Sequence, residues 1–246
     1  MFCNICCRET PYRKCAWPRD ELNCIHCGSC VRQRALYYVF QLLFPTMSDD
    51  VVVHQSSPGN SYFDKILEGY KNYSFSQYFP GVPTGQYHNG VLCADIGNLP
   101  LPSDSIDVFY TLDVFEHLFE PITALKEIYR VLKPGGYYLM TVPLERQYKS
   151  TEKACYLDET NTIIPIPTEM SKAKGVQLEY HGNPIDQTGS VVTYYYGYDL
   201  VETIKNNTPF EVQVFFHNGD LLPFGIEGIY KDVFVCKKNV VITESS

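Results

Sequence analysis

The stretch that decides the fold is DIGNLPLPSDSIDVFYTLDVFEHLFEPITALKEIYRVLKPGGYYLMTVP, residues 95–143. Within it, residues 106–112 form a short apolar run that predicts a strand. Residues 121–132 then carry apolar side chains at helical spacing, behind a proline that suits the first turn of a helix. Those apolar positions are Ile122, Leu125, Ile128 and Leu132. The glycines of KPGG end this helix, and residues 137–142 predict the next strand. A strand, a helix and a strand in this order favour parallel pairing.

The chain on either side continues the alternation of strands and helices. Helices are predicted at residues 62–69 and 198–206. The remaining strands are predicted at residues 51–54, 73–78, 91–95, 210–216 and 232–237. The last two read as an antiparallel pair, and the others favour a parallel arrangement. The pattern therefore predicts an α/β fold with a doubly wound, mostly parallel, seven-stranded sheet. Ligands of such sheets bind at the carboxyl ends of the strands, near the point where the strand order reverses.

The decisive segment resembles the core of class I S-adenosylmethionine (SAM)-dependent methyltransferases, in the subgroup often called type 11. The motifs DIGNLPLPSDSID, DVFEHL, ALKEIYRVLKPGG and YYLMTVP occur in the order and at the spacing of that family. The chain is also similar to a less described subgroup that has an N-terminal cysteine module and a first turn of the SPE or SPG type. Here the corresponding motifs are CIHCGSCVRQR, SSPGNS, YSFSQYFPGVPTG and YHGNPIDQTGSVVTYYYGYDL, which together span nearly the whole chain. The resemblance implies a Rossmann-like fold, SAM as the cofactor and methyl transfer as the activity.

The resemblance also implies cofactor contacts just after two of the strands. Asp95 could accept a hydrogen bond from the exocyclic amine of adenine, and Ile96 could cover the ring face. Taken alone, Asp95 could instead be a helix or turn cap. Asp113 follows the next strand and so lies at the cleft. In the family the Glu116–His117 pair lines the pocket, although a histidine in such a place often only packs or hydrogen-bonds.

The first turn after a strand, HQSSPGNS, is poor in the glycines that let the family's backbone approach the methionine carboxylate and the ribose. Gly59, with Ser57 as a hydroxyl donor, could still receive a carboxylate at the start of the next helix. The second strand lacks the acidic residue that typical members use to hold the ribose. Ser76, Gln77 and Tyr78 stand in its place, and Ser76 and Tyr78 could bond the ribose more weakly than a carboxylate does. A non-catalytic relative that kept the fold is therefore an alternative.

Seven of the ten cysteines lie in the first 30 residues. Two C-x2-C pairs can place four thiolates around one zinc ion, and the predicted ligands are Cys3, Cys6, Cys24 and Cys27. Residues 1–45 are thus predicted to be a small zinc knuckle and a helix at 31–44, with the metal supplying folding energy. Four spare donors could replace a named ligand: Cys7, Cys15, His26 and Cys30. Free thiols in a reduced compartment are the alternative.

Residues 46–246 form the predicted methyltransferase domain. Within them, residues 144–190 read as an insertion or lid that builds the acceptor pocket. His181 and Tyr180 are its candidate catalytic residues, because they could orient or deprotonate an acceptor hydroxyl or amine. A tight loop held by the neighbouring glycine, asparagine and proline is the alternative for this run. Further acceptor contacts are predicted at Glu145 and Arg146.

The formal net charge of −8 favours a small-molecule or saccharide-type acceptor over nucleic acid. Arg32 and Arg34 lie in a basic N-terminal region and leave open an RNA or protein methyltransferase that docks its substrate through the zinc module. Arginines at the start of a helix, however, more often face solvent. No apolar run is long enough for a membrane span, and the N-terminus lacks the regions of a signal peptide. We therefore expect a cytoplasmic protein.

Overall fold

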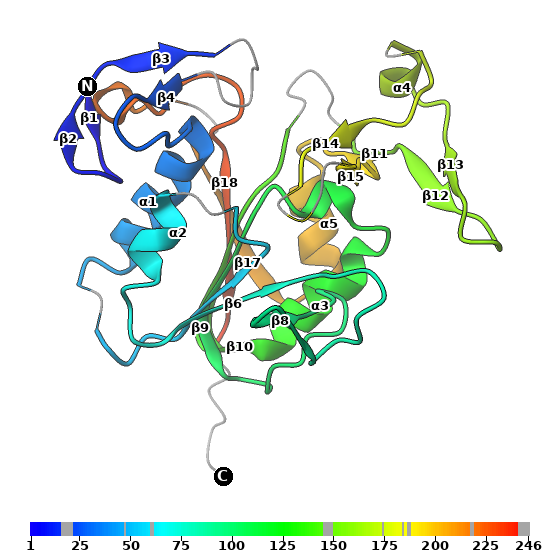
Figure 1. The fold of residues 1–246 in the computed structure, drawn as a ribbon, viewed down its shortest axis with the longest axis horizontal. Helices are drawn as coiled ribbons and strands as arrows, with labels where there is room; N and C mark the ends of the chain where they lie inside the picture. The colour runs from blue at the N-terminus through cyan, green and yellow to red at the C-terminus, as the bar shows by residue number, and fades with distance from the viewer. Residues whose placement is uncertain are drawn as a thin grey trace.

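A computed structural model describes the chain except for residues 16–21, 47, 60–61, 145–149, 174, 184, 186–187, 217–218 and 241–246. Its centre is one mixed sheet with helices on both faces (Figure 1). In spatial order the strands are β17 (Phe210–Phe215), β18 (Val233–Lys238), β10 (Leu132–Thr141), β9 (Ile106–Leu112), β5 (Val53–Ser56), β6 (Tyr73–Gln77), β8 (Val91–Cys93) and β7 (Tyr87–His88).

The predicted doubly wound, mostly parallel sheet is confirmed, but the count of seven strands was wrong. The five strands β8, β6, β5, β9 and β10 run parallel, and β18 and β17 form the predicted antiparallel pair at one end. An eighth strand, β7, pairs antiparallel with β8 at the other end. Asn89 and Gly90 join these two strands, and both have positive φ. An Asn-Gly pair favours a two-residue hairpin of this kind, and it was the overlooked signal in the sequence.

The strand order reverses between β5 and β9. From β5 the chain proceeds to β6 and β8 on one side, and it then crosses to β9 on the other side of β5. The carboxyl ends of all five parallel strands consequently meet at one edge of the sheet. In open α/β sheets the crevice at such a reversal is the usual place for a ligand.

Alternating side chains of the strands supply two separate cores. On one face, α1 (Val31–Leu43) and α2 (Tyr62–Leu67) pack with Val108 and Tyr110 of β9. On the other face, α3 (Pro121–Val131) and α5 (Leu200–Asn207) pack with Phe109 of the same strand. Because a strand points successive side chains to opposite faces, the consecutive apolar residues at 108–110 of β9 indicate a strand that is covered on both sides.

The N-terminal module consists of two short hairpins that lead into α1. The hairpins pair β1 (Phe2–Cys3) with β2 (Arg8–Glu9), and β3 (Tyr12–Lys14) with β4 (Leu22–Cys24). The expectation that Arg34 faces solvent was wrong, because its side chain is completely buried. Its guanidinium donates to four backbone carbonyls, those of Leu22, Ser29, Phe224 and Gly225. Arg34 thereby joins the module to the short helix η3 (Leu222–Phe224) and the glycine that follows it.

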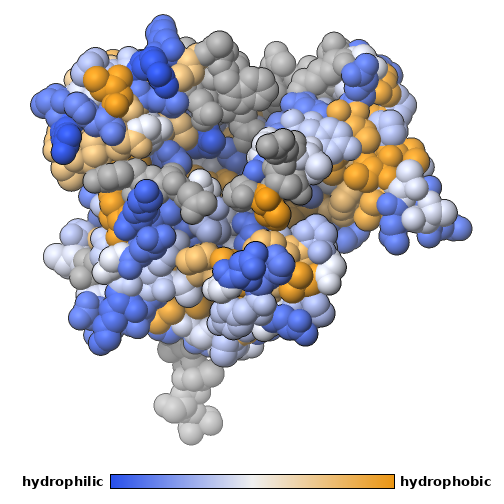
Figure 2. Space-filling model, viewed as in Figure 1, coloured by the Kyte–Doolittle hydropathy of each residue, from blue (hydrophilic) through white to orange (hydrophobic). Residues whose placement is uncertain are grey.

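The segment after β10 forms small two-stranded sheets beyond the main sheet. The pairs are β11 (Glu152–Lys153) with β16 (Tyr194–Tyr195), β12 (Cys155–Leu157) with β13 (Ile163–Pro165), and β14 (Tyr180–His181) with β15 (Ser190–Val191). The hairpin β12–β13 and the helix α4 (Glu169–Ala173) project away from the body of the molecule (Figure 1). Figure 2 shows an apolar group in this projecting part, where Leu157 is 40% exposed.

Candidate functional site

The register of the parallel strands brings the predicted cofactor contacts to one edge of the sheet. Ser56 pairs with Ser76 on one side and with Thr111 on the other. The residues that follow β5, β6, β8 and β9 therefore form one row across the sheet. That row contains Ser57, Tyr78, Asp95 and Asp113.

The first turn of the sheet has an unusual backbone conformation. Ser57 has φ of 59°, in the left-handed region, and its N–H donates to the carbonyl of Ser76 at 2.8 Å. Gly59 follows on the surface, and a Cβ built on it would meet nothing within 4 Å. Gly59 is exposed, and this turn lacks the glycine cluster of typical members.

The two predicted ribose contacts in β6 and beyond it lie in different surroundings. The Ser76 hydroxyl is buried and lies 3.0 Å from Nε2 of His54, while Nδ1 of the same ring lies 2.8 Å from Ser74 Oγ. Burial lowers the pKa of His54 to about 4, so the ring is neutral. Ser76 thus has a partner inside the sheet, and its placement does not favour a contact with a ligand. Tyr78, by contrast, is half exposed.

The side chains of Asp95 and Ile96 also lie in different surroundings. Oδ1 of Asp95 accepts the N–H of Gly97 at 2.8 Å, so the aspartate caps its own turn. A turn cap was the alternative role considered for this residue. Its carboxylate remains on the surface at the end of β8. Ile96 is buried in the core on the α3 face, where it packs inward, and this position does not favour a contact with an adenine ring.

Asp113 is engaged by the protein itself. Its φ is 53°, and its N–H donates to the carbonyl of Thr141 at 3.1 Å. Thr141 Oγ1 donates to Oδ1 at 2.9 Å, and Nε of Arg32 lies 2.6 Å from Oδ2. Both carboxylate oxygens therefore have partners, so the structure gives Asp113 a clear role in joining α1 to the sheet.

A predicted cofactor contact, His117, and a predicted catalytic residue, His181, are brought together beside Glu116. Oε1 of Glu116 lies 3.6 Å from Nε2 of His117 and 3.7 Å from Nδ1 of His181. The two rings are nearly perpendicular, with centroids 5.3 Å apart. Glu116 is almost fully buried, and the rings keep a small exposed part. The group combines the helix η2 (Phe115–His117), directly after β9, with the strand β14.

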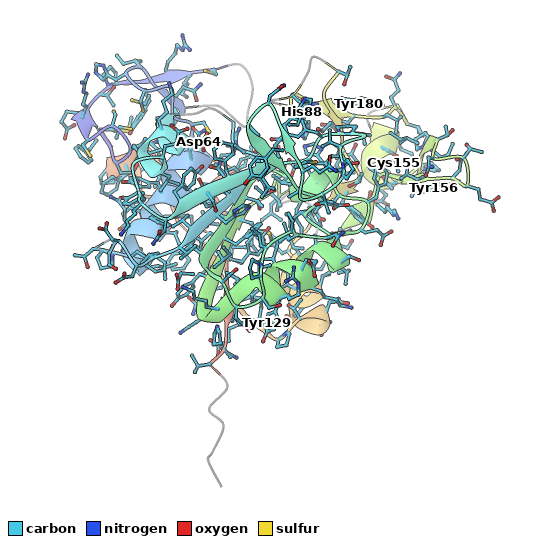
Figure 3. All side chains as sticks on the ribbon, turned by 60° about the horizontal axis from the view of Figure 1, so that its bottom comes forward. Asp64, His88, Tyr129, Cys155, Tyr156 and Tyr180 are labelled. Atoms are coloured by element: carbon cyan, nitrogen blue, oxygen red, sulfur yellow. The ribbon has the colours of Figure 1, made fainter. Side chains whose placement is uncertain are left out.

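The other predicted acceptor contacts are not part of this group. The side chain of Tyr180 is half exposed on the surface (Figure 3). Glu145 and Arg146 lie outside the described residues. Glu179, which the sequence interpretation passed over, lies with Oε1 3.2 Å from Nε2 of His181 and accepts the Tyr195 hydroxyl at 3.0 Å.

The four predicted zinc ligands also converge. The sulfur of Cys3 lies 3.7 Å from that of Cys27, and the sulfurs of Cys6 and Cys24 are 3.8 Å apart. A tetrahedral zinc site with bonds of about 2.3 Å separates its sulfurs by about 3.8 Å. In the described part of the chain, all four sulfurs form one group within 4.8 Å of one another. The donor set and spacing therefore fit a zinc ion.

The spare donors lie elsewhere. Cys7 and His26 are exposed, and Cys15 lies beyond β3. Cys30 is the N-cap of α1, where its N–H donates to Oε1 of Gln33 at 3.0 Å.

Among the four predicted ligands, Cys24 has a lowered pKa. Burial raises the pKa of its thiol, but hydrogen bonds from the backbone N–H groups of Cys27 and His26 outweigh this effect, and the pKa falls to about 7.

Residues 76–140 match the family model described as "Methyltransferase domain". The matched span begins in β6 and ends in β10, so it contains most of the residues at the carboxyl edge. A helix that combines the length and hydropathy of a membrane span is absent from the described part of the chain.

Two relatives match over short segments of this chain. A probable S-adenosylmethionine-dependent methyltransferase of Mycolicibacterium smegmatis is 41% identical over 49 residues, which are 20% of this chain and 19% of that protein. The malonyl-acyl-carrier-protein O-methyltransferase of a Marinomonas species is 32% identical over 65 residues, 26% of this chain and 24% of that protein. The matched part of the chain therefore spans less than a quarter of the length of these relatives.

Solved structures resemble the chain over a longer span at lower identity. The S-adenosylmethionine dependent methyltransferase of Mesorhizobium loti is 12% identical, with a TM-score of 0.48. The superposition covers 82% of this chain and 97% of that one.

Proposed function

We propose that the protein is a SAM-dependent methyltransferase that acts on a small-molecule or saccharide-type acceptor. The observation that carries this proposal is the family match over residues 76–140, which runs from the end of β6 through β8 and β9 into β10, four of the five strands whose carboxyl ends form the edge. The strand order reverses beside these strands, where ligands of such sheets usually bind. The segments shared with the two relatives support the same chemistry, since both are described as methyltransferases.

The residues at this edge offer suitable groups for the donor. The exposed carboxylate of Asp95 would accept a hydrogen bond from the adenine amine. The open backbone at Gly59 would receive the methionine carboxylate, and Tyr78 would contact the ribose from the surface. When bound, SAM supplies an activated methyl group on a sulfonium. The protein then has to align the acceptor with that methyl group and exclude water.

The acceptor side is formed by the segment that follows β10, as a lid over the carboxyl edge. His181 would orient the acceptor and take up its proton where the acceptor must lose one. Its ring is held by Glu179 on one side and faces Glu116 on the other. Tyr180 would contribute from the rim, since it is half exposed. The net charge of −8 also favours an acceptor other than nucleic acid.

The positions of Arg32 and Arg34 argue against the alternative function, in which the zinc module docks an RNA or protein substrate. Arg34 is buried, and Arg32 is paired with Asp113. Neither side chain is available as a free positive charge for RNA, so this alternative is not favoured. Zn²⁺ held by Cys3, Cys6, Cys24 and Cys27 instead has a structural role in this proposal, because it would fix the hairpins against α1.

Isothermal titration with SAM and its demethylated product, S-adenosylhomocysteine, tests the proposal. We expect saturable binding of both ligands, weakened about tenfold or more in Asp95→Ala through loss of a charge-assisted hydrogen bond. Asp158→Ala is the matched control, since Asp158 also caps an exposed turn, at a distance from the carboxyl edge. If neither ligand binds, the proposal is wrong, and the chain is a non-catalytic relative that kept the fold.

A further inference from the structure

Three potential metal ligands meet around His181, and methyl transfer by itself does not require this convergence. The carboxylate of Glu116 and the rings of His117 and His181 each present one ligand atom, and these atoms lie within 4.8 Å of one another. Glu116 contributes Oε1, which lies 3.6 Å from one ring nitrogen and 3.7 Å from the other. These separations are too long for hydrogen bonds, which measure about 2.7–3.2 Å. Two metal–ligand bonds of about 2.1 Å at a tetrahedral angle span about 3.4 Å, which is close to the observed values.

The outer partners of both rings determine which nitrogen carries a lone pair. Nδ1 of His117 lies 2.8 Å from the carbonyl oxygen of Val191, which can only accept, so Nδ1 donates and Nε2 keeps its lone pair. Nε2 of His181 lies 3.2 Å from the carboxylate of Glu179, so this nitrogen donates and Nδ1 keeps its lone pair. A carbonyl or carboxylate behind each ring is the usual arrangement of metal-binding histidines.

With neutral rings, the nitrogen atoms that face Glu116 are therefore both acceptors, as is the carboxylate oxygen between them. Three acceptors that converge in a nearly buried place suit a positive charge among them. Glu116 is 1% exposed, and the rings of His117 and His181 are 17% and 12% exposed. The arrangement has the features of a site that is completed by a cation.

We propose that Glu116, His117 and His181 bind a first-row divalent metal ion of the Zn²⁺ or Fe²⁺ type, separate from the cysteine site. Two imidazoles and one carboxylate are a ligand set that such ions favour. Three protein ligands leave at least one coordination position open, as in metal sites that bind an exogenous oxygen ligand. The site requires no bound SAM, so its existence does not depend on the proposed methyl transfer. While a metal ion occupies Nδ1 of His181 and Nε2 donates to Glu179, this ring cannot take up a proton, and its role in methyl transfer would be to orient the acceptor.

The backbone around the site fixes its two halves against each other. The N–H of Thr193 donates to the carbonyl of Glu116 at 2.7 Å, and its hydroxyl lies 2.7 Å from the carbonyl of Leu118. These bonds hold η2 against the residues that follow β15. His117 and His181 are 64 residues apart, and the packing of β14 and β15 on η2 is what brings them together.

Metal stoichiometry of the full-length protein tests the proposal. The protein would be loaded with Zn²⁺, freed of excess metal by gel filtration, and assayed by inductively coupled plasma mass spectrometry. We expect His117→Ala and Glu116→Gln each to retain one equivalent fewer than the wild type. His88→Ala, which removes an exposed histidine of β7 (Figure 3), is the matched control and should retain the wild-type content. Equal zinc content in all four proteins would overturn the proposal.

Cobalt substitution keeps the test decisive if a variant is poorly folded. Co²⁺ in the cysteine site gives thiolate charge-transfer bands, whereas Co²⁺ bound by nitrogen and oxygen does not. We expect His117→Ala to keep the thiolate bands and lose one equivalent of Co²⁺, because the N-terminal module remains folded. Loss of the thiolate bands together with both equivalents of Co²⁺ would show that His117→Ala is misfolded. The Co²⁺ content of Glu116→Gln, which preserves side-chain volume, would then decide whether the site exists. SAM titration of the same samples separates failure of this site from failure of the proposed function.

Discussion

Nε of Arg32 lies 2.6 Å from Oδ2 of Asp113, and this ion pair joins the helix after the cysteine turns to the carboxyl edge of the sheet. The side chains are 21% and 10% exposed, so solvent screens the pair only partly. Thr141 donates to the other carboxylate oxygen, which fixes Asp113 at the end of β9. The N-terminal module is thus connected to the edge at which the proposed donor site lies.

The ion pair should contribute measurably to stability. We expect Arg32→Gln to lower the free energy of unfolding by about 1.5–3 kcal/mol, the range for hydrogen bonds to charged groups. A double-mutant cycle with Asp113→Asn, followed by urea denaturation, isolates the interaction between the two side chains. Arg8→Gln, on the exposed strand β2, should change stability little. A coupling energy near zero would show that the pair does not link α1 to the sheet.

Removal of zinc should affect the N-terminal module first. We expect a chelator, or Cys24→Ser, to release the metal, lower the thermal midpoint and expose the first residues to proteolysis, since this small module derives its folding energy from the metal. Cys7→Ser is the matched control, because Cys7 is exposed and lies outside the four-sulfur group. If Cys7→Ser lost zinc and Cys24→Ser kept it, the ligand assignment would be wrong.

His54 should make stability depend on pH. Burial lowers its pKa from 6.5 to about 4, so the folded protein resists protonation of this ring while the unfolded chain accepts it. The stabilisation from the neutral ring is complete above pH 6.5 and is lost as the pH falls through about 4. The shift corresponds to about 3 kcal/mol.

Comparison of the wild type with His54→Gln isolates this contribution. Both proteins would be unfolded by urea at several pH values between about 7.5 and 4, and zinc loss at acidic pH would affect both alike. We expect the free energy of unfolding to fall by about 3 kcal/mol more in the wild type than in the variant. Parallel pH profiles would show that folding does not shift the pKa of His54 from its value in the unfolded chain.

The sequence predicted the strands and helices well, because their apolar periodicity reflects burial in the two cores. The cysteine spacing likewise predicted the four sulfurs that converge, since a C-x2-C turn determines where its own sulfurs point. Side-chain partners were harder to predict. Arg34 was expected to face solvent, but it is buried, and its four carbonyl partners come from β4, the turn before α1 and the η3 region. Such long-range contacts leave no local pattern in the sequence.

The site at Glu116 shows the same limit. His117 and His181 were predicted as functional residues from two separate motifs, one as a cofactor contact and the other as a catalytic residue. Only the packing of β14 and β15 on η2 brings both rings to one carboxylate. Glu179, which holds one of the rings, could have been suspected from its place two residues before His181.

Gly189 should be necessary for the position of His181. Its φ is 77°, and a Cβ at this position would lie 2.5 Å from the carbonyl oxygen of His181, a contact that requires the backbone to move. We expect Gly189→Ala to be destabilised by about 1–3 kcal/mol, as for other strained backbone positions, and to displace the His181 ring from Glu116. Gly182→Ala in the same loop is the matched control, because a Cβ there would meet nothing within 4 Å. Thermal unfolding measures the stability of both variants, and their zinc content reports on the ring. If Gly189→Ala kept the wild-type stability and zinc content while Gly182→Ala lost both, the contact between Gly189 and His181 would not be what positions the ring.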